Sequence, residues 1–319
     1  MKGGFSSIWA AHLRAFLAFK RTLGYSYRRA EFTLRVLDRY LVENARAGGQ
    51  PHLAQVILNW LGRQPGRKPI SVAGELAVVR QFYTFLRRRG DRNLREPSWP
   101  QLPATSDYLP YVFSIQDIRQ LLHLTEKLRG PFRRTTYRML ILVLYCTGLR
   151  FGEPLRLRLR EVDLARATFF IAASKGRSRW VPFHPSLRFE LKRYLVTRKA
   201  FAPAGPDDRV FVGSNGTTLS IGTASSTVRR LLRMAGLKPQ TGRAGPRPYD
   251  LRHAFAVHRL TRWYRAGVDL HARLPWLSAY MGHDDLLGTE TYLTATPELL
   301  ALAGNRFHRR FLAVGRTPE

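Results

Sequence analysis

Cysteine is almost absent from this chain. The single cysteine, Cys146, directly follows an apolar run from Met139 to Tyr145. One cysteine excludes a disulfide framework and a cysteine metal site. Its position after the apolar run favours a buried structural thiol over a nucleophile or a metal ligand.

Long apolar runs are missing as well. The stretch 139–145 is the longest, and it is much shorter than the roughly 20 residues that span a bilayer. The N-terminus carries no apolar segment that resembles a signal peptide. These features predict a soluble protein of the cytoplasm with no membrane partner.

Acidic residues are scarce relative to basic ones. The chain has 22 Asp and Glu against 53 Lys and Arg, a formal net charge of +31. So much like charge predicts a polyanionic partner, which by default is nucleic acid. The basic residues are mostly arginines in runs such as Arg87-Arg88-Arg89, and arginine binds phosphate and guanine in a bidentate way. A structural RNA binder is the alternative, although such proteins are usually shorter and richer in lysine.

Helical spacing of apolar residues marks the first part of the chain. Four early segments carry it: Leu13, Phe16, Leu17; Val36, Leu37, Tyr40, Leu41; Leu53, Val56, Ile57, Trp60; and Leu76, Val79, Phe82, Tyr83, Leu86. Glycine and proline fall between these segments, as at Gly48-Gly49-Gln50-Pro51. The pattern predicts a small domain of four helices over residues 1–96.

Prolines mark a boundary after Glu96. Pro97, Pro100, Pro103 and Pro110 interrupt any periodicity, and residues before proline favour extended backbone. We therefore predict a linker over 97–113 and a second domain over 114–319. This domain opens with Ser114 and Asp117, whose spacing is that of a helix N-cap with its acidic partner, and a helix to about Lys127 is expected.

The rest of the second domain alternates helices with a little sheet. Two short strands, 167–172 and 179–183, flank Ser174-Lys175-Gly176-Arg177 and predict a hairpin with Lys175 at its tip. Helices are expected around 139–145 and over 185–198, 224–235, 251–264 and 274–281. The fold class is therefore mainly α, a four-helix domain followed by a mostly helical domain with a small antiparallel β-sheet.

Four motifs carry the chemistry. They are Thr147-Gly148-Leu149-Arg150 with Gly152-Glu153, then Asp250-Leu251-Arg252-His253, then Gly282-His283, and last Tyr292. Arg150 and Arg252 offer forks of N–H donors to the non-bridging oxygens of a phosphodiester. A tyrosine helped by neighbouring cations or a base can attack the phosphorus. Two arginines, a histidine and a late tyrosine thus predict a phosphodiester site.

In this order and spacing, the motifs resemble the active-site boxes of the tyrosine recombinase (lambda-integrase-type) family. The resemblance covers nearly the whole chain. It implies a core-binding domain over 1–96 and a catalytic domain over 114–319 that cleave and rejoin duplex DNA at specific sites. It also implies a 3′-phosphotyrosine intermediate, which needs no ATP, cofactor or metal.

The family resemblance implies a role for each site residue. Arg150 and Arg252 would clamp the scissile phosphate, and Tyr292 would be the nucleophile. His283 would support proton transfer and bind the phosphate. Lys175 would be the general acid that protonates the leaving 5′ oxygen, a role that the nearby Arg177 and Arg179 could contest.

One position departs from the family pattern. Three residues before Arg252, the family most often has histidine and this chain has Tyr249. A tyrosine hydroxyl can donate to a phosphate oxygen, but it is no cation near neutral pH. We retain Tyr249 as a candidate site residue.

Four acidic residues near these motifs are given no part in the chemistry. Glu153 and Asp163 are expected to hold the loop of Arg150. Asp284-Asp285, beside His283, are expected to be solvated rather than to bind a metal.

Several biological roles fit these residues. The arginine-rich chain resembles recombinases encoded by small mobile elements, which predicts integration, excision or transposition of such an element by a homo- or hetero-tetramer on double-stranded DNA. The C-terminal tail would pack on a neighbouring subunit or on its own domain. A type IB topoisomerase is an alternative. Another is a DNA-binding partner that assembles with sister recombinases and cleaves little itself.

Overall fold

The chain divides into two compact units, Met1–Tyr108 and Leu109–Glu319. In the computed structural model, the described residues are 4–45, 53–63, 66–90, 94, 97–102, 110–174, 177–283, 289, 292, 304–305 and 307–308. Among them, no helix is both long and apolar enough to span a membrane.

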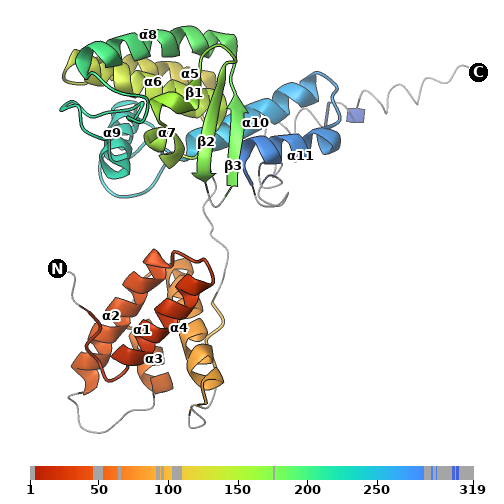
Figure 1. Cartoon of the computed structure of the whole chain (residues 1–319). Helices are drawn as coiled ribbons and strands as arrows, with labels where there is room; N and C mark the ends of the chain where they lie inside the picture. Colours follow the sequence, from red (N-terminus) through yellow and green to blue (C-terminus); the bar gives the residue numbers. More distant parts are fainter. Residues whose placement is uncertain are drawn as a thin grey trace, which may run out of the picture. The chain divides into compact units, whose positions relative to one another are not determined.

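The described part of the first unit is helical (Figure 1). Its helices are α1 (Ala10–Thr22), α2 (Arg28–Ala45), α3 (Leu53–Leu61) and α4 (Pro69–Arg88). Leu13, Leu37, Trp60 and Phe82 are among its fully buried side chains. They lie at the positions that helical periodicity predicted, because those residues form one apolar face on each helix.

The second unit combines helices with a small sheet (Figure 1). Its helices are α5 (Ile115–Leu124), α6 (Pro131–Thr147), α7 (Gly152–Arg156), α8 (Pro185–Phe201), α9 (Ile221–Met234), α10 (Asp250–Arg265) and α11 (Leu270–Met281), with 3₁₀ turns η1 (Thr125–Lys127) and η2 (Leu159–Glu161). The strands are β1 (Val162–Asp163), β2 (Thr168–Ser174) and β3 (Arg177–Pro182). The mainly α fold with a small antiparallel sheet is confirmed.

The sheet is antiparallel in the order β1-β2-β3. Phe169 pairs with Val181, and both are buried, whereas the next pair, Phe170 with Trp180, lies on the other face with Trp180 59% exposed. One face therefore packs on the core and the other faces solvent, as is common for antiparallel sheets. The strand β1 was not predicted, because two residues are too few to show an alternating pattern.

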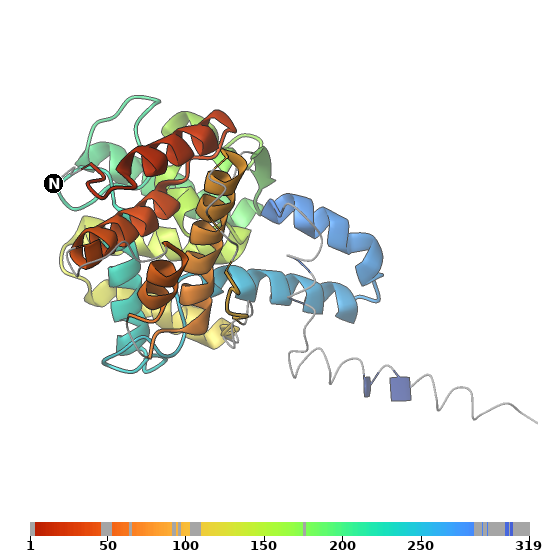
Figure 2. The same ribbon diagram turned by 90° about the horizontal axis from the view of Figure 1, so that it is seen from below.

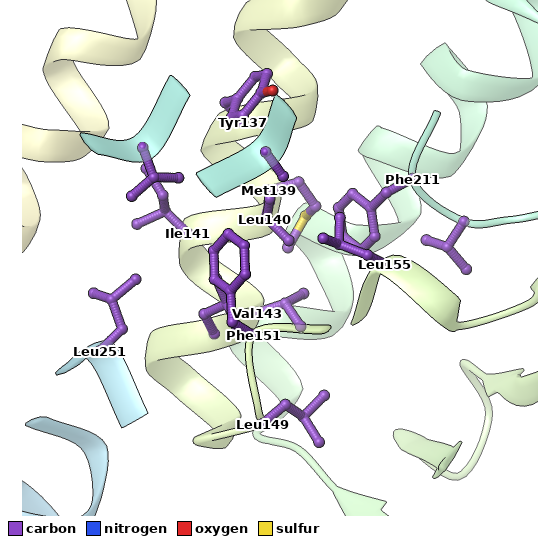
Figure 3. Close-up of a cluster of buried hydrophobic side chains, with 14 of the residues drawn as sticks. Tyr137, Met139, Leu140, Ile141, Val143, Leu149, Phe151, Leu155, Phe211 and Leu251 are labelled. Carbon is purple, nitrogen blue, oxygen red and sulfur yellow. The ribbon is translucent and has the colours of Figure 1, made fainter. Parts of the chain in front are cut away.

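Helix α6 is the centre of the second unit's core. It packs against both α8 and α10, so it buries residues around much of its circumference, including Leu140, Ile141 and Val143. Figure 3 shows these side chains meeting Leu251 of α10 and Phe211 of the loop that follows α8. This packing explains why the apolar run in the sequence is continuous rather than periodic.

Three local predictions can be judged directly. The N-cap at Ser114 is confirmed: its hydroxyl accepts from the Asp117 amide at 3.1 Å, and the Asp117 carboxylate accepts from the Ser114 amide at 2.8 Å. The helix becomes 3₁₀ after Leu124 but reaches Lys127 as expected. Cys146 is partly buried, and burial raises the pKa of its thiol to about 11, so it stays protonated near neutral pH.

Helices α10 and α11 lie side by side (Figure 2) and contact each other. The sequence placed the start of α11 at Leu274, but it begins at Leu270, where the Asp269 side chain accepts from the His271 amide at 2.9 Å. Pro275 lies inside this helix. A proline normally marks a helix start, so the sequence pattern led us to place the start of α11 next to Pro275 and to miss its first turn. The pair matters because the start of α10 and the end of α11 both contribute residues to the candidate functional site.

Candidate functional site

Arg150 lies just beyond the C-terminal end of α6. The helix ends at Gly148, which has a left-handed φ of 60° and whose amide donates to the Leu144 carbonyl at 3.0 Å. A Cβ at this position would lie 2.3 Å from Cδ1 of Phe255. Both the backbone conformation and the contact with Phe255 thus require glycine, and the turn directs the chain into the site.

Glu153 holds Arg150 in place. Its Oε2 accepts from the Arg150 backbone amide at 2.8 Å, and its Oε1 accepts from Nη1 of Arg150 at 3.1 Å. The Glu153 side chain has no exposed surface. Arg150 also donates from Nη2 to the Gly282 carbonyl at the end of α11. The predicted supporting role of Glu153 is confirmed.

The same prediction was wrong for Asp163. Its carboxylate accepts from the Arg166 backbone amide at 2.9 Å and closes the turn between β1 and β2. The carboxylate also lies 3.9 Å from Nε of Arg166, so local partners within the turn satisfy it.

Arg252 is an almost fully buried charge of the site. It is 1% exposed and donates from Nη1 to the Gly148 carbonyl and from Nη2 to the Met281 carbonyl, each at 2.8 Å. These bonds join α10 to the ends of α6 and α11. Burial lowers the pKa of the guanidinium. Its Nε is buried with no hydrogen-bond partner among the described residues.

His283 follows the left-handed C-cap Gly282 of α11. Its Nε2 lies 2.8 Å from Nη2 of Arg252, and its Nδ1 lies 2.7 Å from Oγ1 of Thr289. Arginine can only donate, so Nε2 is the acceptor in this arrangement. A neutral ring then carries its proton on Nδ1 and donates it to the Thr289 hydroxyl.

Tyr292 packs between two histidine rings. It is 4% exposed, with its ring 5.9 Å from His283 in a stacked arrangement and 5.1 Å from His253 edge to face. Burial raises the pKa of the Tyr292 phenol, while the positive charges of Arg252 and Arg150 act in the opposite direction. The phenol therefore stays protonated at neutral pH, close to two cations.

Tyr249 is the residue at the start of α10. It is 39% exposed, and its ring lies 5.5 Å from the ring of His253. It is near enough to Tyr292 that its negative form would raise the pKa of that phenol. Tyr249 thus lies at the open side of the cluster, where its hydroxyl can reach a ligand.

The structure brings five of the six sequence-predicted site residues together: Arg150, Tyr249, Arg252, His283 and Tyr292. Lys175 and Asp284-Asp285 lie outside the described residues. No group of three or more His, Cys, Asp or Glu side chains that could hold a metal ion occurs in the described part of the chain.

Sequence reasoning did not identify two residues that shape the site. His253 was part of a motif but had no role assigned. Burial lowers its pKa to about 4, so it is a neutral ring against Tyr292. Arg179 was considered only as a rival of Lys175, yet it donates to Glu153 from Nη1 at 3.0 Å and from Nη2 at 2.9 Å. Its position in β3 gave no sign of this long-range contact.

The assembled site is suited to a phosphate diester. Two guanidinium groups held by backbone carbonyls and a carboxylate present fixed donors, and a phenol lies beside them. Fixed donors stabilise the added negative charge of a pentacoordinate phosphorus without reorganising, and the phenol is the nearest nucleophile. The arrangement fits attack of tyrosine on a phosphodiester.

Comparisons with known proteins agree with this geometry. The phage integrase family model matches residues 112–298. The putative integrase/recombinase y4rB of Sinorhizobium fredii is 34% identical over 311 residues, covering 94% of this chain and 96% of its own. Tyrosine recombinase XerD of Caulobacter vibrioides is 30% identical over 237 residues, 74% of this chain and 74% of its own.

A solved structure shares the fold. The Tn1549 transposon integrase, in complex with transposon right end DNA, aligns over 93% of this chain and 99% of its own with a TM-score of 0.65. Its sequence identity is 17%, so this likeness concerns the fold alone.

Proposed function

Because the chain belongs to the phage integrase family of tyrosine recombinases, enzymes of site-specific DNA recombination, we propose that Tyr292 cuts its DNA by forming a 3′-phosphotyrosine. The observation that supports this most directly is the contact chain at the site. Tyr292 stacks on His283, whose Nε2 accepts from the buried Arg252 at 2.8 Å. A nucleophile, a phosphate-binding cation and the histidine that orients it are thus adjacent.

The proposed step exchanges one phosphodiester for another. The Tyr292 oxygen forms a bond to phosphorus, and the bond from phosphorus to the 5′ oxygen breaks. The phenolic proton leaves for a base as the bond forms, and the 5′ oxygen gains a proton and departs as a hydroxyl. Because the bond energy is kept in the phosphotyrosine, a 5′ hydroxyl of another strand can reverse the step and rejoin the DNA.

Arg150 and Arg252 bind the non-bridging oxygens in this proposal. Both are fixed by partners on α6, α7 and α11, so they need no reorganisation when the charge on the phosphate grows. The buried Nε of Arg252, with no partner in the described residues, gives the site unused donor capacity. Removal of one such donor from an enzyme site typically slows the reaction by about 100- to 1,000-fold.

Two assignments rest on the sequence and its family resemblance. Lys175 is proposed as the general acid that protonates the 5′ oxygen. Tyr249 is proposed to donate its hydroxyl to a phosphate oxygen in place of the usual histidine. A neutral donor keeps the hydrogen bond but gives up the charge, and bonds to charged donors are about twice as strong.

We further propose that the substrate is the end of a mobile element and that the enzyme acts as a tetramer on double-stranded DNA, alone or with sister recombinases. The similarity of the chain to a putative integrase and the shared fold with a transposon integrase support this role. The first unit is proposed to be the core-binding domain and the second the catalytic domain.

The mechanism is tested by trapping the covalent intermediate. Nicked duplexes built from the ends of the element that encodes the chain release a short fragment after cleavage, which prevents rejoining. We expect the wild-type chain to give a slow-migrating protein–DNA band on a denaturing gel, and Tyr292→Phe to give none. Tyr280→Phe is the matched control, since Tyr280 also lies near the site but bonds to the Pro182 carbonyl, and it should give the band.

Two alternatives predict other results. If the chain is a non-cleaving partner of sister recombinases, the recombinant product of the mixed assembly will be nearly unchanged by Tyr292→Phe. If it is a type IB topoisomerase, it will relax supercoiled DNA without joining two duplexes. A band that persists in Tyr292→Phe would exclude this tyrosine as the nucleophile.

A further inference from the structure

Arg179 of β3 forms a fork on the carboxylate that holds Arg150. Its Nη1 donates to Oε1 of Glu153 at 3.0 Å, and its Nη2 donates to Oε2 at 2.9 Å. The Arg179 side chain is only 12% exposed, and that of Glu153 has no exposed surface. Such paired, parallel bonds between arginine and carboxylate fix direction as well as distance.

The same guanidinium also contacts the end of α11. Its Nε donates to the Tyr280 carbonyl at 2.9 Å. A Cβ added to Gly282 would lie 2.9 Å from Cζ of Arg179, so the guanidinium lies directly against this glycine. His283 is the next residue. Arg179 therefore contacts both the support of Arg150 and the segment that positions His283.

The Glu153 carboxylate is shared between two arginines, and this sharing weakens its attraction for the Arg150 guanidinium. Oε1 accepts from both Arg150 and Arg179, so the pair of arginines around one carboxylate keeps a net positive charge. Without Arg179, the buried Glu153 carboxylate would lose the guanidinium that binds both of its oxygens. Arg150 would then be drawn more strongly onto the carboxylate and would no longer be available to a phosphate oxygen, because a buried charge that loses its partner is costly.

We propose that Arg179 is a positioning residue for DNA strand cleavage. It occupies one side of the Glu153 carboxylate and so leaves the Arg150 guanidinium available to the scissile phosphate. Through the Tyr280 carbonyl and Gly282, it also keeps the end of α11 and His283 in register with the arginines. This inference rests on the proposed cleavage by Tyr292 and adds a residue that does not itself touch the DNA.

The test compares cleavage rates at saturating DNA. Single-turnover formation of the covalent band on the nicked duplex is measured for wild type, Arg179→Met and Arg179→Lys. We expect Arg179→Met to be about 100-fold slower, the loss typical of a misplaced catalytic group, with DNA affinity within about threefold. Arg179→Lys keeps the charge but not the fork, so an intermediate rate is expected.

A second substitution separates this role from plain structural support. If Arg179 acts by restraining the charge of Glu153, then Arg179→Met combined with Glu153→Gln should cleave at least about tenfold faster than Arg179→Met alone. If Arg179 only braces the fold, the double variant should cleave no faster than Arg179→Met alone, because both substitutions disrupt the same Arg179–Glu153 contact and residues in contact are not additive. A double variant that is no faster than Arg179→Met would overturn the proposal.

Controls keep the outcomes distinct. Tyr280→Phe removes a different bond between α11 and β3 and should cleave at the wild-type rate. If wild type forms no covalent band, the result contradicts the proposed cleavage by Tyr292 and does not bear on the role of Arg179. If wild type cleaves and Arg179→Met is equally fast, the inference fails alone. Should Arg179→Met not fold by thermal melting, Arg179→Lys with and without Glu153→Gln carries the same comparison.

Discussion

At the scale of single residues, His253 is notable because its ring stays neutral near neutral pH. Its ring packs between those of Tyr249 and Tyr292 at 5.5 Å and 5.1 Å. Burial lowers its pKa to about 4, and Arg247 and Arg252 act in the same direction. A charged imidazole against the Tyr292 ring would add a third cation beside Arg150 and Arg252. The neutral ring of His253 instead forms an uncharged wall of the site.

This low pKa predicts a pH-dependent stability. Between about pH 4 and 6.5 the unfolded chain binds more protons at His253 than the folded chain does, so stability falls as pH falls through this window. From pH 7 to 4.5, wild type should lose about 1–2 kcal/mol more than His253→Gln, a figure reduced because the ring is partly exposed. Urea unfolding at the two pH values measures it.

The matched control is His271→Gln, since His271 is an exposed histidine near the start of α11. It should lose as much stability on acidification as wild type does. Equal losses for wild type and His253→Gln would contradict the assignment of a neutral, buried ring.

At the scale of elements, three helix ends meet at one point. The carbonyl of Gly148, at the end of α6, and that of Met281, in the last turn of α11, both accept from Arg252 of α10. Carbonyl groups at helix C-terminal ends carry partial negative charge and lack intrahelical partners. A buried guanidinium satisfies them, so the catalytic arginine and the fold depend on the same bonds.

Gly148→Ala tests this junction. The left-handed backbone costs about 1 kcal/mol for alanine, and the overlap with Phe255, 2.3 Å from the added Cβ, costs about 1–3 kcal/mol more. We expect the Tm of the second unit to fall by at least about 5 °C, and the cleavage rate to fall because Arg252 and Arg150 are displaced. Differential scanning calorimetry measures the first effect.

Gly236→Ala provides the comparison. Gly236 has a similar φ of 72°, but nothing lies within 4 Å of an added Cβ. Gly236→Ala should lower the Tm only by the cost of the left-handed backbone, about 2–4 °C, and should leave the cleavage rate unchanged. Equal effects of the two substitutions would mean that the Phe255 contact at Gly148 does not matter.

At the scale of the whole molecule, the charge of the chain is its main property. The net charge is +31, and most of the arginines that the structure describes have exposed side chains that can reach DNA phosphates. Each phosphate that such a side chain neutralises releases condensed counterions from the DNA. Binding of duplex DNA should therefore depend steeply on salt, whatever the sequence of the site.

We expect log K against log salt to have a slope of roughly −5 to −9, the value for about six to ten neutralised phosphates. Fluorescence anisotropy of a labelled duplex between about 0.1 and 0.4 M KCl measures this slope for the full chain. Tyr292→Phe should have the wild-type slope, since it removes no charge. A slope near zero would contradict binding through the phosphate backbone.

Most of the helices and the family could be predicted from the sequence. Apolar spacing identified the helices of both units, and the motifs around Arg150, Arg252 and His283 pointed to the family. The failures were local. The strand β1 and the helix α7 are too short to show a period, Pro275 hid the start of α11, and Asp163 closes its own turn instead of holding Arg150.

The sequence by itself determined the family, the mainly helical fold and the candidate residues, because those depend on residue types and their spacing along the chain. Only the tertiary structure decided which atoms meet. The neutral tautomer of His283, the burial of Arg252 and the sharing of Glu153 between Arg150 and Arg179 all depend on contacts between residues far apart in the chain. Such contacts are set by the packing of α6, α10 and α11, and spacing within a segment does not encode them.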